Sequence, residues 1–77
     1  MSLDEAARQL KMAVHDAQVS FDLIGLGDLD RAQENAVTAR AAIEATITAL
    51  DRASEDLSPD EARVEGEKAV MAVSENS

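Results

Sequence analysis

The sequence contains no cysteine, and this absence removes two ways in which small domains are stabilised. Without thiols there is neither a disulfide framework nor a thiolate metal site, and one histidine, His15, is too few for a histidine-based zinc site. A single core in a chain of 77 residues rarely supplies more than about 3–5 kcal/mol without such help. Association with another chain is the device that remains, so we expect an oligomer.

Aromatic residues, signal-like segments and long apolar runs are also scarce. Phe21 is the single aromatic residue. The first residues lack the basic and apolar regions of a signal peptide, and no apolar run approaches the roughly 20 residues of a membrane span. Together with the lack of cysteine, these features predict a soluble, cytoplasmic protein.

Basic residues are outnumbered, because 16 acidic side chains face 7 Lys and Arg and give a net charge of −9. Nucleic acids and anionic membranes would repel such a chain, so we expect neither as a partner. The excess is uneven, since residues 51–77 carry eight acidic and three basic side chains. This acidity is interpreted either as a solvated surface or as a surface that covers a basic region of another protein.

The few glycines and the one proline mark the ends of helices. Ser2 followed by Glu5 has the pattern of a capping box, which starts a helix at residue 3. Gly25 is predicted to take the left-handed conformation that ends this helix, with Leu26 folding back onto it. The first helix is therefore expected over about residues 3–24.

Two further helix starts follow. Asp28 is a good N-cap for a second helix over residues 28–57, and the short connection makes the two helices an antiparallel hairpin. Ser58-Pro59-Asp60-Glu61 combines a capping box with proline at the first helical position and predicts a short third helix over residues 59–73. Residues 74–77 are expected to be a frayed tail. The fold class is all-α: one domain, either a three-helix bundle or a dimeric helical bundle.

Heptad spacing predicts the contact between the first two helices. Apolar residues recur at four-three intervals on both, and on the second helix large residues alternate with small ones. Alanine along such a seam lets two helices approach closely. We expect a tight hairpin whose core seam consists of Leu10, Val14, Phe21 and Ile24 from the first helix and Leu29, Ile43, Ile47 and Leu50 from the second. The edge of Ala32, Ala39, Thr46 and Ala53 is expected to lie beside it.

The first helix carries a second apolar stripe on its opposite side. Met12, Val19, Leu23 and Leu26 form this stripe. A helix with two apolar faces must be covered from both sides, by a third element or by another chain. We therefore predict that this stripe is an interface, and the alternative is burial under the third helix.

Residues that could bind a ligand or take part in a reaction are few, and each has a simpler structural explanation. Gly25-Leu26-Gly27 resembles a phosphate loop only superficially, because acidic residues follow it and no lysine does. Asp28-Leu29-Asp30 lacks the remaining ligands of a calcium loop. His15 is expected on the surface, with a pH-sensing role if a dimer paired two copies. The acidic cluster of Glu55, Asp56, Asp60 and Glu61 surrounds a helix start, where carboxylates serve capping.

The sequence thus predicts a protein that is not an enzyme and needs no metal or cofactor. We expect a module for protein–protein interaction that self-associates through its first helix, as a homodimer, and holds a protein partner. The alternative is an acidic regulator, such as an inhibitor, an antitoxin or a nucleic-acid mimic, that covers a basic surface of another protein.

Overall fold

A computed structural model describes residues 3–75, with the side chain of residue 75 excepted. The described residues form three helices and no strand: α1 (Leu3–Gly25), α2 (Leu29–Asp56) and α3 (Pro59–Glu75). This confirms the predicted all-α fold. Helix α3 is two residues longer than expected, so part of the predicted frayed tail is helical, and residues 76–77 lie outside the described residues.

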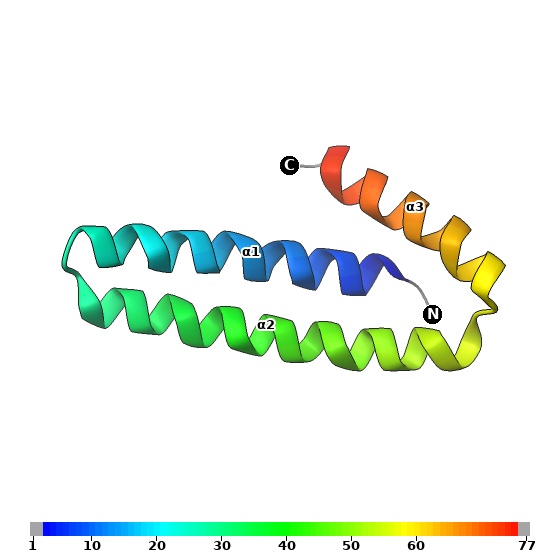
Figure 1. The fold of residues 1–77 in the computed structure, drawn as a ribbon, viewed down its shortest axis with the longest axis horizontal. Coiled ribbons are helices and arrows are strands. Elements are labelled where there is room, and N and C mark those ends of the chain that lie inside the picture. Colours follow the sequence, from blue (N-terminus) through cyan, green and yellow to red (C-terminus); the bar gives the residue numbers. More distant parts are fainter. Residues whose placement is uncertain (1–2, 76–77) are drawn as a thin grey trace.

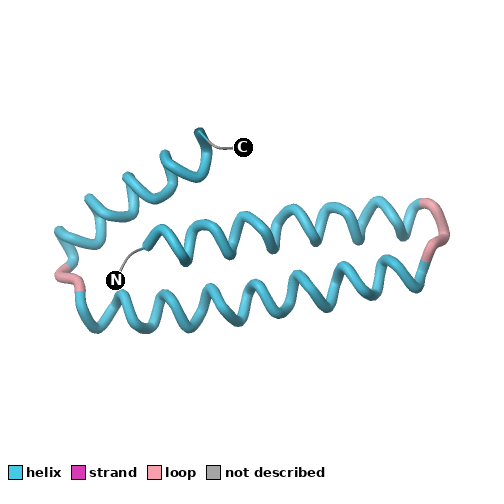
Figure 2. Tube along the Cα trace, turned by 180° about the vertical axis from the view of Figure 1, so that it is seen from behind, coloured by secondary structure: helices cyan, strands magenta, loops and turns pink. Residues whose placement is uncertain are grey.

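The three helices lie close to a single layer. Figure 1 shows α1 and α2 antiparallel along the whole length of α1, with α3 turning back beside the N-terminal part of α1. Figure 2 shows the same order from behind, with α3 diverging from α1 toward its C-terminal end. The chain measures 46 × 24 × 14 Å, and its radius of gyration is 14.6 Å, against about 11.5 Å for a compact domain of this length. A second layer that would cover the helices is absent from the described residues.

The turn between α1 and α2 is a Schellman motif centred on Gly27. Gly27 has a φ of 77°, its N–H donates to the carbonyl of Ile24 at 3.0 Å, and the N–H of Asp28 donates to the carbonyl of Leu23 at 3.0 Å. The prediction that Gly25 holds the left-handed position was wrong, because Gly25 is the last residue of α1. Leu26 does not fold back either, since it is 80% exposed. Both differences arise because the left-handed position lies at Gly27, two residues later than expected, so that Gly25 is still helical.

The caps of α2 and α3 form as predicted. The carboxylate of Asp28 accepts a hydrogen bond from the N–H of Arg31 at 3.3 Å. At α3, the N–H of Ser58 donates to the Glu61 carboxylate at 2.8 Å, while the N–H of Glu61 donates to the Ser58 hydroxyl at 3.2 Å. This reciprocal pair is a complete capping box.

The capping box predicted for α1 involves Ser2, which lies outside the described residues. Its partner Glu5 instead accepts hydrogen bonds from side chains of its own helix. Arg8 donates to one carboxylate oxygen, and Gln9 donates to the other at 2.9 Å.

Small side chains fill the seam between α1 and α2. The buried residues of α1 are Ala6, Ala13, Ser20 and Leu23, and those of α2 are Ala32, Ala39, Ala42, Thr46, Ala49 and Ala53. The predicted edge of Ala32, Ala39, Thr46 and Ala53 is therefore confirmed. Both sets keep heptad spacing, so the helices form a close antiparallel pair along an alanine-rich line.

The prediction of the large residues in this seam was wrong. Leu10, Val14, Phe21, Ile24, Leu29, Ile43, Ile47 and Leu50 are 44–71% exposed. The small residues follow a parallel heptad register, and the closest approach of two helices favours the register with the smaller side chains. The large residues are thereby displaced to one flank of the seam.

Helix α3 packs on the beginning of α1 through its small residues. Ala69 is 1% exposed, and a Cβ on Gly66 would lie 3.7 Å from Cδ1 of Leu3. Burial of the predicted stripe under α3 is not what the structure shows, because Met12 is 51% exposed. Leu23, which is buried, lies two residues before the end of α1, at the turn between α1 and α2.

Candidate interaction surface

Eight large apolar side chains of α1 and α2 lie on one side of the hairpin. Spacings of three, four and seven residues put them on one side of each helix. Two hollows lined by both helices join these sides: one by Ala17, Ala36 and Ile43, and one by Leu10 and Leu50 together with Gly66 and Val70 of α3. We call this surface the apolar face, and it consists of Leu10, Val14, Phe21, Ile24, Leu29, Ile43, Ile47 and Leu50.

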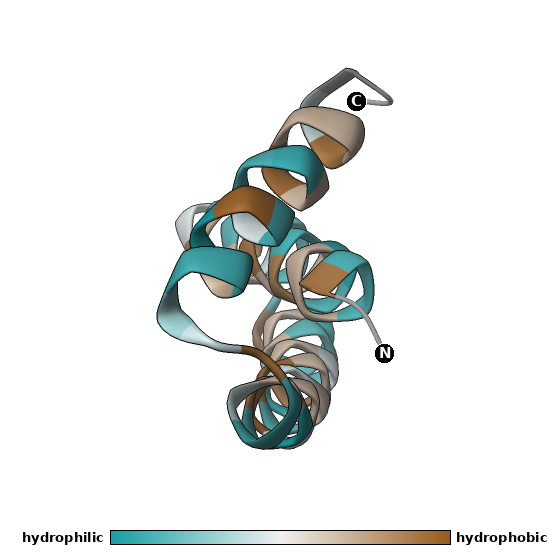
Figure 3. Cartoon of the chain, turned by 90° about the vertical axis from the view of Figure 1, so that its right-hand side faces the viewer, coloured by the Kyte–Doolittle hydropathy of each residue, from teal (hydrophilic) through white to brown (hydrophobic). Residues whose placement is uncertain are grey.

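The apolar face is larger than a monomeric protein ordinarily exposes. From their exposed fractions, its eight side chains present roughly 900 Å², whereas the largest apolar patch of a typical monomer is about 300–600 Å². The accessible surface of the chain is 5521 Å², against about 4,500 Å² for a compact monomer of its mass. Hydrophobic positions are accordingly not confined to the space between the helices (Figure 3).

The buried core is correspondingly poor in large apolar side chains. Its nine apolar members are eight alanines and Leu23, and no large side chain among the described residues is fully buried. Since stabilisation by burial scales with apolar area, an alanine contributes much less than a leucine or phenylalanine. Most of the hydrophobic side-chain area of this chain is thus still available for a contact.

The eight side chains of the apolar face are uncharged, although the chain as a whole has a net charge of −9. The ionisable residues that accompany them are Arg40 and Glu44, which line the hollow together with Ile43. The four ion pairs of the described residues, Arg8–Glu5, Arg31–Asp28, Arg63–Glu67 and Lys68–Glu65, are all within single helices or their caps and are exposed. Such pairs contribute a few tenths of a kcal/mol each and define no site.

The structure does not bring the predicted interface residues into one surface. Met12 and Leu26 are exposed, Val19 is half-buried, and Leu23 is 7% exposed. Leu23 is therefore already covered by its own chain, because it belongs to the seam with α2.

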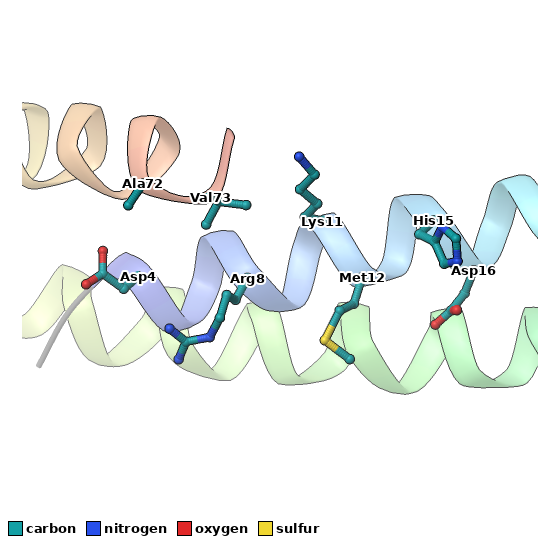
Figure 4. Close-up of a pocket in the computed structure, with 8 residues that line it drawn as sticks. All are labelled: Asp4, Arg8, Lys11, Met12, His15, Asp16, Ala72 and Val73. Atoms are coloured by element: carbon teal, nitrogen blue, oxygen red, sulfur yellow. The ribbon is translucent and has the colours of Figure 1, made fainter. Parts of the chain in front are cut away.

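A cleft of about 620 Å³ lies between α1 and the end of α3 (Figure 4). Its polar lining consists of Asp4, Arg8, Lys11, His15 and Asp16, and all of these except the permanently charged Arg8 are residue types that can transfer a proton. Figure 4 shows these side chains spread along α1, with Lys11 and Arg8 extending to opposite sides of the helix. A general base must share one reacting position with its partners, and these groups do not converge on one.

Features that would indicate a polar ligand are not found in residues 3–75. No cluster of three or more His, Asp or Glu residues there is arranged to hold a metal ion, and no buried side-chain nitrogen or oxygen lacks a hydrogen-bond partner. Within the acidic cluster, Glu61 is engaged in the cap of α3. Its pKa is held below the ordinary value of 4.5 by hydrogen bonds to the backbone and side chain of Ser58.

Within the same range, no helix combines the length and apolarity needed to cross a membrane. Comparisons of the chain with known protein families, with curated proteins and with solved structures each give no match. The function has to be argued from the apolar face itself. Sequence reasoning identified its residues but assigned them to the wrong contact.

Proposed function

We propose that this protein is a non-enzymatic protein–protein interaction module that self-associates as a homodimer and in that form holds a protein partner. The observation that carries the proposal is the exposed apolar face on a hairpin whose own core consists mostly of alanine. Helical domains are stable when their apolar stripes are packed between two layers of helices, whereas the helices of this chain lie close to a single layer.

The size of the chain supports the same conclusion. A domain of 77 residues without disulfides or metal depends on an extensive core, and small side chains alone provide little. Contact with another chain adds the missing burial. It also explains why so many large aliphatic residues persist on a surface that is otherwise strongly acidic.

An acidic regulator of a basic protein is the second candidate, and the charge of −9 favours it. An acidic surface alone, however, gives no reason for the apolar face. We therefore rank it below the interaction module.

The solution mass tests the proposal. Light scattering on a sizing column should give twice the chain mass of 8.2 kDa, at low salt and at 1 M salt, where the Debye length is about 3 Å. Apolar contacts persist or strengthen as salt is added, so the dimer should remain. A mass of one chain in both conditions would contradict self-association. A complex with a basic protein that is lost at high salt would favour the acidic regulator.

A further inference from the structure

We infer that the apolar face binds the same face of a second copy of this chain, so that two α1/α2 hairpins form a four-helix core. The inference rests on the proposed function and names the surface and its occupant. It differs from the sequence prediction, which assigned the interface to Met12, Val19, Leu23 and Leu26.

The largely aliphatic character of the face favours a second copy as the occupant. A surface bearing carboxylates or ammonium groups would lose their hydration against Phe21, Ile24 and Ile47 and find no opposite charge there. A matching surface must be mainly aliphatic, as this face itself is apart from Arg40 and Glu44 at its hollow. The acidic side chains of both copies then remain in solvent, outside the contact.

The shape of the face is suited to pairing with itself. A two-fold contact uses the same patch on both copies, so the patch must contain both protrusions and hollows. Phe21 protrudes, at 71% exposed, and one helical turn away Ala17, Ser20, Ala36 and Ala39 line a hollow of about 350 Å³. An aromatic ring from one copy matches a hollow in the other whose lining combines these small side chains with Ile43 and with the longer Arg40 and Glu44.

The area is what a stable dimer needs. A standard interface takes about 800 Å² from each partner, and the eight side chains of the face expose roughly 900 Å². Pairing would move these side chains from solvent into the interior of a bundle of two packed layers.

The chain's own third helix cannot take this role. Helix α3 borders the face only at the open end of the hairpin, where Gly66 and Val70 meet Leu10 and Leu50. With 17 residues it is about 26 Å long, and it diverges from α1 (Figure 1). Phe21, Ile24 and Leu29, at the turn end, remain uncovered.

Charge substitutions on exposed residues test the assignment. Phe21→Glu and Ile47→Glu should lower the light-scattering mass from two chains to one, because a carboxylate cannot be buried in the contact unpaired. Met12→Glu and Leu26→Glu are matched controls, exposed to similar degrees outside the face, and they should stay dimeric. Circular dichroism should show unchanged helicity in the two controls, whereas the two face variants should melt at lower temperature because they lose the burial that the contact supplies.

A cysteine scan gives a second readout that does not depend on dissociation. The chain has no cysteine, so Ala36→Cys introduces one thiol in the hollow and Ala45→Cys one on the outer side of α2, both exposed in the single chain. In the dimer, a maleimide should modify the first about tenfold more slowly than the second, because it reacts only when the contact opens.

The outcomes separate the two proposals. A wild-type mass of one chain removes self-association and this inference with it. A wild-type dimer that survives Phe21→Glu and Ile47→Glu, or in which Ala36→Cys and Ala45→Cys react equally fast, leaves self-association standing and overturns the assignment of the face. Dissociation by Met12→Glu alone would restore the interface expected from the sequence.

Discussion

The hydroxyl of Ser20 on α1 donates a hydrogen bond of 2.7 Å to the carbonyl oxygen of Ala32 on α2. Both residues are buried in the seam, at 8% and 5% exposed. A bond from a side chain of one helix to the backbone of the other can form only when the two helices are close, and it is lost if they slide. The pair therefore fixes both the separation and the register of the hairpin.

Replacing Ser20 by alanine should lower the free energy of unfolding by about 0.5–1.5 kcal/mol, the usual value of one such bond. Urea denaturation at a fixed chain concentration measures the change. Ser54→Ala is the control, because the Ser54 hydroxyl is exposed and bonds to the carbonyl of Asp51 in its own helix at 2.9 Å. Equal losses in the two variants would show that the bond to Ala32 has no special role.

Ala39→Leu should separate the helices, since Ala39 is 6% exposed and lies in the middle of the α2 seam. Overpacking of this kind costs about 1–3 kcal/mol, although leucine is the better filler of an ordinary core. The midpoint of denaturation should fall, whereas Ala41→Leu, an exposed position on the same helix, should leave it nearly unchanged. A stabilised Ala39→Leu variant would mean that the helices are not in close contact.

The two glycines of the turn should respond to alanine with opposite signs. Gly27→Ala places a Cβ on a residue with a φ of 77° and should cost about 1–2 kcal/mol. Gly25→Ala, at a helical position with nothing within 4 Å of the new Cβ, should stabilise by about 0.4–1 kcal/mol. Thermal melts of both variants measure the difference. If Gly25→Ala destabilised the protein and Gly27→Ala did not, the left-handed residue would be Gly25.

Acid should weaken the start of α3. Because the folded-state pKa of Glu61 lies below its ordinary value of 4.5, the carboxylate stabilises the cap above that pH, and this contribution is lost as the pH falls through the folded-state pKa. Glu61→Gln keeps an acceptor for the N–H of Ser58 but does not titrate. Between pH 6 and about pH 3, helicity by circular dichroism should fall further in the wild type than in the variant.

The same comparison has an internal control. Glu5 also has a lowered pKa, owing first to its hydrogen bond with Gln9 and then to that with Arg8, but it is present in both proteins and cancels in the difference. Identical acid profiles would show that the capping box does not depend on the charge of Glu61.

The helices and their caps were predictable because their signals are local. Asp28 and the Ser58–Glu61 pair act on backbone groups within one turn, so the sequence alone contains both partners. The position of Gly25 was misjudged because a Schellman motif is defined by which residue reaches a positive φ, and two nearby glycines offered the same signal.

The packing register was not predictable from hydrophobicity. Phe21 and Ile43 fit the heptad pattern of a core as well as Ser20 and Ala39 do, and hydropathy favours the larger pair. What distinguishes them is backbone proximity, a property of two helices together. The run of Ala6, Ala13 and Ser20 against Ala32, Ala39 and Thr46 was the available signal, since small residues at matched heptad positions on adjacent helices permit close approach.

An alanine seam also has a thermal consequence. The heat capacity change of unfolding follows the apolar area exposed, at about 0.45 cal/K/mol per Å², and the seam of a lone hairpin exposes little. A plot of the free energy of unfolding of the lone hairpin against temperature should therefore be only weakly curved. Pairing through the apolar face would supply most of the heat capacity change. The temperature at which the free energy of unfolding is greatest is therefore set by the dimer rather than by the single folded chain.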